Sequence, residues 1–267
     1  MMNTDSLDTL CSALTYAMGI TPPSQAAPPN DKLCDYLDAA LDGQKVSRIF
    51  MYNPDGIAQW LYEKYPHLFA EVQQRSDTEI PFCTVMPSVT PVCFATMYTG
   101  AQPAVHGIQA YVKPVIRTDT VFDALIRSGK KAAIVSTSGD SMSRIFLERD
   151  MDYFIYDTVE EVNAKASSLI LQDTYDFIAV YNKNYDACMH KFGPESIEAL
   201  GELRSNVRTF GTFAELIKEH WKSHNTLIGF ATDHGCHEID GNCGSHGLDM
   251  EEDLNITHFY KVLKAVE

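Results

Sequence analysis

Residues 152–181 read DYFIYDTVEEVNAKASSLILQDTYDFIAVY, and this stretch decides the fold. The segments 152–157 and 175–181 are short apolar runs rich in Ile, Phe and Tyr, which is typical of buried strands. Between them, residues 159–171 carry apolar side chains at helical spacing. A strand, a helix and a second strand in this order predict parallel strands connected by a covering helix.

The same alternation continues on both sides of this stretch. We expect further strands at 48–53, 79–86, 131–136 and 227–232, and further helices at 55–65, 91–100, 121–129 and 195–222. Residues 256–266 suit either a closing strand or a closing helix. The pattern predicts an α/β protein, a three-layer sandwich with a mostly parallel sheet covered by helices on both faces.

The first 45 residues differ from this pattern. We expect two helices there, at 5–18 and 31–41, joined by the proline-rich loop TPPSQAAPPN. No internal repeat or change of composition follows, so we divide the chain into an N-terminal helical extension, 1–45, and a single α/β domain, 46–267, that carries the catalytic site. The extension covers the core as a helix pair, covers a sheet edge, or makes a subunit contact.

Composition narrows the choice of partners. The 267 residues contain 21 Lys plus Arg against 36 Asp plus Glu, a formal net charge of −15, which argues against nucleic acid. No basic, apolar leader opens the chain and no apolar run reaches membrane-spanning length, so we expect no membrane partner. Seven cysteines without a CxxC pair suit reduced thiols in the cytoplasm. The sequence does not indicate an oligomeric state.

Chemically active side chains follow four of the expected strands. Ligands of such folds bind outside the carboxyl ends of the strands, so these residues should meet at one edge of the sheet. In chain order they are Asp55, Thr90, Asp186 with His190, and Asp233 with His234.

Several of these side chains suit a metal ion. Asp186 and His190 are four residues apart, which places them on one helix face, and His246 follows Asp233-His234 in a Gly-Ser-His-Gly context. Aspartate and histidine ligands suit zinc, and manganese or iron also accept them.

Thr90 precedes Pro91 and a helical pattern, so we expect Thr90 at the N-cap and Pro91 at the first helical position. One interpretation is a capping threonine and nothing more. The other is a hydroxyl placed where a helix N-terminus attracts an anion, activated as a nucleophile by a metal.

Together these motifs resemble a known family. The segment Pro87-Ser-Val-Thr90-Pro-Val-Cys-Phe-Ala-Thr-Met-Tyr-Thr-Gly100 followed by His106-Gly-Ile is similar to the nucleophile segment of type I phosphodiesterases and nucleotide pyrophosphatases in the alkaline phosphatase superfamily. Asp186-x3-His190 with Phe-Gly-Pro194 is similar to their second metal motif, and Asp233-His-Gly235 to their third. Asp55 matches the carboxylate that closes their first strand. The resemblance covers roughly 47–260 and implies an alkaline-phosphatase-like fold.

The resemblance also implies a mechanism. Two divalent metals, usually zinc and with manganese as the alternative, would be held by two sets of ligands, Asp55, Asp233, His234 and Thr90 for one and Asp186, His190 and His246 for the other. Thr90 would attack phosphorus and form a phosphothreonine that water hydrolyses. We therefore expect a metal-dependent phosphoric ester hydrolase that acts on a small phosphate mono- or diester.

Some residues depart from the family pattern. Tyr111 stands where the family has an asparagine that contacts a phosphoryl oxygen, and nearby Lys113 either replaces that contact or is a solvated surface lysine. His237 competes with His246 as the last ligand. Cys93 lacks the surroundings of a sulfatase nucleophile, and the short spacings leave no room for the cap domain of a mutase. A phosphonate hydrolase and a metal-binding protein that has lost catalysis remain the alternatives.

Overall fold

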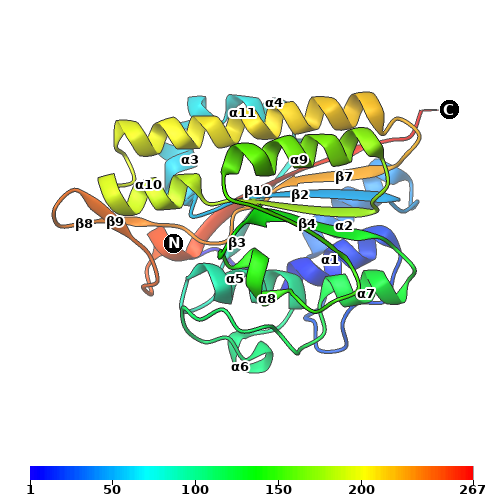
Figure 1. Cartoon of the computed structure of the whole chain (residues 1–267), viewed down its shortest axis with the longest axis horizontal. Coiled ribbons are helices and arrows are strands. Elements are labelled where there is room, and N and C mark those ends of the chain that lie inside the picture. The colour runs from blue at the N-terminus through cyan, green and yellow to red at the C-terminus, as the bar shows by residue number, and fades with distance from the viewer. Residues whose placement is uncertain (267) are drawn as a thin grey trace.

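An eight-stranded sheet lies between two layers of helices in the computed structural model, which describes residues 1–266 (Figure 1). Glu267, the last residue of the expected 46–267 domain, lies outside the described residues. The strand order is β1-β3-β10-β7-β2-β6-β4-β5. β10 pairs antiparallel with β3 and β7, and the other pairs are parallel. The predicted α/β class with a mostly parallel sheet is confirmed.

Helices separate the successive strands from β1 to β7 along the chain. Their order and bounds are β1 Asp5–Ser6, α1 Thr9–Met18, α2 Asp31–Leu41, β2 Arg48–Pro54, α3 Gln59–Lys64, η1 Pro66–Phe69, α4 Ala70–Gln74, β3 Thr78–Cys83, α5 Thr90–Thr99, α6 Pro103–His106, α7 Val121–Arg127, β4 Ala132–Thr137, α8 Met142–Ile145, β5 Asp152–Tyr156, α9 Val159–Gln172, β6 Phe177–Asn182, α10 Asn184–Phe192, α11 Ile197–His220, β7 Thr226–Phe230, β8 His237–Ile239, β9 Cys243–Ser245, α12 Glu251–Leu254 and β10 Asn255–Leu263.

Each face of the sheet has its own apolar core because successive strand residues point to opposite sides. Ile49 and Met51 of β2 pack against one helix layer, whereas Phe50 and Tyr52 pack against the other. Figure 1 shows α3, α4, α9, α10 and α11 above the sheet and α1, α5, α7 and α8 below it.

The N-terminal segment differs in part from the sequence-based expectation. The predicted helix at 5–18 begins at Thr9, because residues 5–6 form the edge strand β1, parallel to β3. The backbone N–H of Leu7 continues this pairing by donating to the carbonyl of Cys83. The second helix, α2, has the predicted bounds 31–41.

Two strand ends also differ, and both differences shape the functional edge. The predicted strand 79–86 stops at Cys83, so a loop leads to Thr90. The predicted helix at 55–65 begins only at Gln59, because residues 55–58 form a turn with Gly56 at φ +73°. The closing element, for which a strand and a helix were both open, is the antiparallel strand β10.

Two further predictions concern membranes and thiols. Within residues 1–266, every helix is too short or too polar to cross a bilayer. All seven cysteines are free thiols, and no disulfide joins any of them.

A buried histidine makes the stability of this fold depend on pH. The Nδ1 atom of His106 accepts a hydrogen bond from the backbone N–H of Ile108, and its Nε2 atom lies 3.0 Å from Thr96 Oγ1. Burial lowers the pKa of His106 to about 4, so unfolding takes up a proton between about pH 6.5 and 4. We expect the metal-free protein to lose about 2 kcal/mol of stability from this residue between pH 7.5 and 5.

Urea unfolding of the wild type and of His106→Gln at both pH values measures this contribution. Glutamine keeps a donor and an acceptor but does not titrate, so the variant should lose less stability than the wild type on acidification. An equal loss in both proteins would show that His106 is not the responsible group.

Candidate active site

Three carboxylates lie at the carboxyl ends of three neighbouring strands. Asp233 follows β7, Asp55 follows β2, and Asp186 lies in the first turn of α10, directly after β6. The sheet order β7-β2-β6 places these ends side by side. Asp55 and Asp233 are buried, and the Asp186 side chain is 14% exposed. The topology therefore brings three acidic groups to one point.

The first group of possible ligands centres on His234. Its Nε2 atom lies 3.3 Å from Asp55 Oδ1, 3.4 Å from Asp233 Oδ2 and 3.3 Å from Thr90 Oγ1. All four side chains are buried. Residues from β2, the start of α5 and the end of β7 thus converge although they are far apart in sequence.

The second group centres on Asp186 and is more open. Its Oδ2 atom lies 3.4 Å from His190 Nε2, and its Oδ1 atom lies 3.6 Å from His246 Nε2. The ring of His246 stacks on that of His234 with a centroid distance of 3.9 Å, so the two groups are adjacent. The structure brings together all seven residues predicted as metal ligands.

Backbone carbonyls orient the three histidines. The Nδ1 atoms of His234, His190 and His246 lie 2.9, 3.0 and 2.8 Å from the carbonyls of Gly235, Gly244 and Ser88. A carbonyl only accepts hydrogen bonds, so each Nδ1 carries a proton and each Nε2 faces the carboxylates. This tautomer and this aim are those of a metal-ligating histidine. Burial lowers the pKa of His234 and His246, whereas the contact with Asp186 raises the pKa of His190.

One oxygen of each carboxylate lacks a hydrogen-bond partner. Asp55 Oδ1, Asp186 Oδ1 and Asp233 Oδ2 are buried without a hydrogen bond among the described residues. Burial, together with Asp186 and other charged neighbours, raises the pKa of Asp233 to about 7 and that of Asp55 well above its usual range. Burial acts on Asp186 too, but its histidine neighbours outweigh it and lower that pKa. Such a cluster is stabilised by a bound cation.

The spacing of these atoms tests the fit of a metal. Zinc binds histidine nitrogen and carboxylate oxygen at about 2.0–2.1 Å, so two ligands of a tetrahedral site lie about 3.3–3.4 Å apart. The separations in the first group are 3.3–3.4 Å, and those in the second are 3.4 and 3.6 Å. The ligand atoms of Asp55, Asp233 and His234 lie close enough together to share one metal, and so do those of Asp186, His234 and His246. His190 adjoins the second set through its 3.4 Å contact with Asp186.

Thr90 is placed differently from the expected N-cap. Val89 occupies the cap position, Thr90 is the first residue of α5, and Pro91 is the second. The Thr90 hydroxyl makes no capping hydrogen bond and instead faces His234. The pure capping interpretation is wrong, because the β conformation of Val89 moves the start of the helix by one residue. At this helix start the N–H groups of Val92 and Cys93 donate to the Val89 carbonyl and Pro91 has none, so the N–H of Thr90 is the one beside the hydroxyl that has no acceptor among the described residues.

A separate contact set fixes the loop that carries His246. The buried Asp253 has one carboxylate oxygen 2.6 Å from His237 Nδ1, and the other accepts from the Leu248 backbone at 2.8 Å. Its carbonyl accepts from the backbone N–H of Gly235. His237, the competing ligand, is thus engaged by Asp253 and is not part of either group.

Gly235 is required by this packing. A Cβ atom at Gly235 would lie 2.0 Å from the carbonyl oxygen of Glu252, a contact that no side chain tolerates. The glycine of Asp233-His-Gly235 therefore permits the backbone contact that joins the two ligand-bearing segments.

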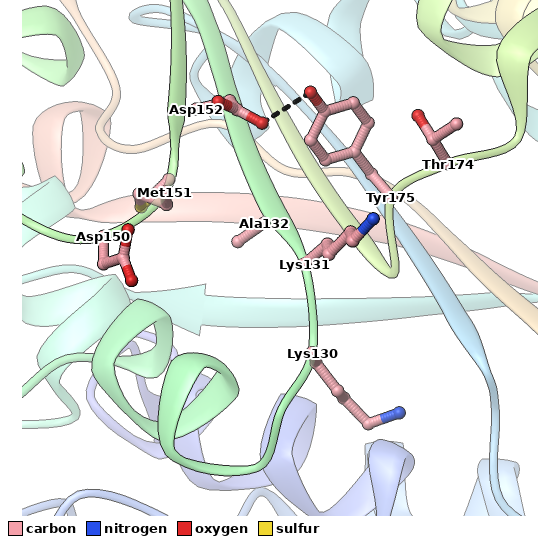
Figure 2. Close-up of a pocket in the computed structure, with 8 residues that line it drawn as sticks. All are labelled: Lys130, Lys131, Ala132, Asp150, Met151, Asp152, Thr174 and Tyr175. Carbon is pink, nitrogen blue, oxygen red and sulfur yellow. Dashed lines mark hydrogen bonds between the residues drawn. The ribbon is translucent and has the colours of Figure 1, made fainter.

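Tyr111 and Lys113 lie outside both groups, at a pocket of about 250 Å³ whose lining also includes Asp55 and Asp186. Tyr111 is 60% exposed, and Lys113 Nζ donates to the carbonyl of Gly139 at 3.0 Å. A different pocket, lined by Lys130, Lys131, Asp152 and Tyr175, lies at the amino ends of β4, β5 and β6 (Figure 2). That pocket is at the opposite edge of the sheet and contains none of the predicted site residues.

The sequence analysis missed Tyr181 and Lys183. The hydroxyl of Tyr181 donates to Asp55 Oδ2, which leaves Oδ1 for His234 and a metal. Lys183 lines the same pocket as Lys113. Both residues lie at the carboxyl end of β6, and that position is the signal that could have identified them.

Comparisons with known proteins agree with this geometry. The profile of the type I phosphodiesterase / nucleotide pyrophosphatase family matches residues 118–264, more than half of the chain. The match includes the ligands from Asp186 to His246 and begins after Asp55 and Thr90. No curated protein sequence matches the chain.

Solved structures share the fold. Human ectonucleotide pyrophosphatase/phosphodiesterase 5 has a TM-score of 0.57 and 17% identity over 72% of this chain and 58% of its own. An inactive form of the murine protein in complex with AMP has a TM-score of 0.57 and 15% identity, over 73% of this chain and 59% of its own. Phosphonoacetate hydrolase from Sinorhizobium meliloti, with phosphonoformate bound, has a TM-score of 0.57 and 17% identity, over 76% of this chain and 61% of its own. The chain therefore spans about three fifths of the length of these structures.

The Asp253 contacts generate a prediction about metal binding. Asparagine at this position can accept only through one oxygen, so Asp253→Asn leaves either His237 or Leu248 without its acceptor and loosens the loop of His246. We expect zinc titration to show one site weakened about 10- to 100-fold and the other little changed.

Asp249→Asn is the matched control, because it makes the same charge change at an exposed position of the same loop. Equal zinc affinities in Asp253→Asn and Asp249→Asn would contradict a positioning role for Asp253.

Proposed function

Because the chain belongs to the type I phosphodiesterase / nucleotide pyrophosphatase family, we propose that it is a two-metal hydrolase of small phosphate esters with Thr90 as its nucleophile. One observation carries the proposal. The Thr90 hydroxyl, at the start of a helix, lies 3.3 Å from His234 Nε2 within a buried group of metal-ligand type. No capping role accounts for that position.

The ligand sets divide between two ions. Asp55, Asp233, His234 and Thr90 would hold one, and Asp186, His190 and His246 would hold the other. The aspartate and histidine donors favour zinc, and manganese is the alternative. When bound, these ions lower the pKa of the threonine hydroxyl and offset the charge that builds up on the phosphoryl oxygens.

The residues of the chain then perform two displacements. Thr90 Oγ1 releases its proton to solvent and forms a bond to phosphorus while the ester P–O bond breaks, and the departing alkoxide takes a proton from solvent to leave as the alcohol. A water molecule next attacks phosphorus and breaks its bond to Thr90 Oγ1, which takes a proton from that water. A monoester thus yields phosphate, and a diester yields a phosphate monoester. The backbone N–H of Thr90 and the dipole of α5 are proposed to stabilise the phosphoryl oxygens throughout.

The substrate side of the proposal rests on the pocket beside these groups. Tyr111 and Lys113 line it and are proposed to contact the bound ester. The seven thiols are free, which favours a reducing compartment, and we propose the cytoplasm.

A phosphonate hydrolase is the second candidate, since cleavage of a P–C bond can use the same ligands. The fold of this chain is as similar to phosphonoacetate hydrolase as to the ectonucleotide phosphodiesterase, each with a TM-score of 0.57. Comparing turnover of phosphonoacetate with that of nitrophenyl phosphate esters separates the two. A lapsed metal-binding protein is disfavoured, because it has no need for a hydroxyl held among intact ligands.

Substitution of Thr90 tests the nucleophile. Thr90→Val keeps the branched shape but removes the hydroxyl, and we expect turnover of a nitrophenyl phosphate ester to fall at least about 1,000-fold. Thr90→Ser keeps a hydroxyl and should retain far more activity than the valine variant. Full activity in Thr90→Val would refute the nucleophile.

Metal removal tests the ligand groups. We expect the loaded protein to contain two divalent ions per chain, and chelation should abolish turnover and lower the melting temperature, because ions bind the native state. Asp55→Asn should reduce the content toward one ion. A protein that is fully active and equally stable after exhaustive chelation would contradict this assignment.

A further inference from the structure

We infer that the pocket of Lys113 and Lys183 binds a second anionic group of the substrate, separate from the phosphoryl group that is transferred. The inference rests on the proposed function, and it specifies the substrate class: a compact phosphate ester or phosphonate that also carries a carboxylate or a second phosphate. This pocket is the one of about 250 Å³ that adjoins both metal groups.

The position of the pocket relates it to the reaction. Its lining includes Asp55 from one metal group and Asp186 from the other, but not Thr90. The wall also includes residues 138–141, after β4, and Lys183, after β6. A substituent on the phosphorus therefore has a polar space to enter on the side of the two carboxylates, and the nucleophile does not occupy that space.

The two lysines provide the charge of the pocket. Neither ammonium group lies within 4 Å of a carboxylate oxygen in residues 1–266, although the chain has an excess of acidic residues. Asp55 and Asp186 are directed to the metal groups, which leaves Asp140 as the acidic neighbour in the lining. With metal ions bound to Asp55 and Asp186, two lysines would face one remaining carboxylate, and that balance favours an anionic ligand.

The Asp140 carboxylate is hydrogen-bonded to residues of β4 and its following loop rather than to the lysines. Its carboxylate accepts hydrogen bonds of 2.8 Å from the Ser136 and Thr137 hydroxyls and from the Ser143 backbone. These contacts fix residues 138–141 against the end of β4. Asp140 therefore builds the wall of the pocket, and its lone pairs are already used.

A second, independent observation points to a ligand. Ser141 is 1% exposed and lines the pocket, yet its hydroxyl oxygen has no hydrogen-bond partner among the described residues. A buried hydroxyl without a partner costs free energy, and an anionic oxygen in the pocket would accept its hydrogen bond. The serine and the two lysines together make a polar site for an anion.

The geometry also separates this site from the phosphoryl group. Lys113 Nζ donates to Gly139 at 3.0 Å, which holds the ammonium on the outer loop of the pocket. Lys183 precedes α10 by one residue, whereas Asp186 lies within its first turn. The lysines thus flank the pocket and are not part of either ligand group.

Calorimetric titration of the zinc-loaded protein tests the inference without relying on turnover. The probes are ethylphosphonate and phosphonoacetate, which differ in one terminal methyl or carboxylate, and methylenediphosphonate, which carries a second phosphonate. We expect the wild type to bind at least one of the two doubly anionic probes about tenfold or more tightly than ethylphosphonate. The probe that gains identifies the preferred anion.

Lysine variants locate the source of that gain. In Lys183→Met and Lys113→Met the preference should fall severalfold, and Lys183→Arg should recover part of it. Lys191→Met is the matched control, since Lys191 lies on α10 over the ring of Phe192 and outside the pocket. It should keep the wild-type preference.

Three results would overturn the inference. The first is equal affinity of the wild type for all three probes. The second is a preference for the doubly anionic probe that persists in both Lys183→Met and Lys113→Met. The third is an equal loss of affinity for all probes in these variants, which would assign the lysines to the phosphoryl group. The first two leave the proposed function intact if a nitrophenyl phosphate ester is still turned over. Failure of the wild type to bind zinc or any probe would reject the proposed function as well.

Discussion

The mutual repulsion of three buried carboxylates governs this structure. Parallel pairing of β7, β2 and β6 brings Asp233, Asp55 and Asp186 to one edge of the sheet, where no lysine or arginine nitrogen in residues 1–266 forms an ion pair with them. Two like charges about 4 Å apart repel by about 4 kcal/mol in a protein-like dielectric. Protonation relieves this repulsion in part, and burial together with the neighbouring carboxylates raises the pKa of Asp233 and Asp55. Divalent cations relieve it without removing the charge that makes these groups good ligands.

The surrounding contacts prepare the histidines for the same purpose. Three carbonyls accept from the Nδ1 atoms of His190, His234 and His246, so each ring, when neutral, presents a bare Nε2 atom to the carboxylates. Burial lowers the pKa of His246 to about 4, which keeps that ring neutral. The backbone thus fixes both the orientation and the protonation state of the ligands, and an ion is not needed to assemble them.

The sequence predicted the strands and their ends because apolar runs and carboxyl-end positions are local signals. It located Asp55, Asp186 and Asp233 in this way, and α2 even to its bounds. It could not place the turn before α3 or the edge strand β1, since both depend on hydrogen bonds to distant segments. The choice between His246 and His237 was open for the same reason: the Asp253 contact that engages His237 joins residues separated along the chain.

Part of the excess of acidic residues is concentrated at the carboxyl-end edge of the sheet. Three of the 36 acidic side chains converge here and are proposed to bind two cations. An anion would therefore meet local positive charge within a protein of net charge −15. Anomalous diffraction from zinc-soaked crystals measures this most directly. The account predicts two zinc peaks, one among Asp55, Asp233, His234 and Thr90 and one among Asp186, His190 and His246. A single peak, or a zinc ion bound by His237 in place of His246, would contradict it.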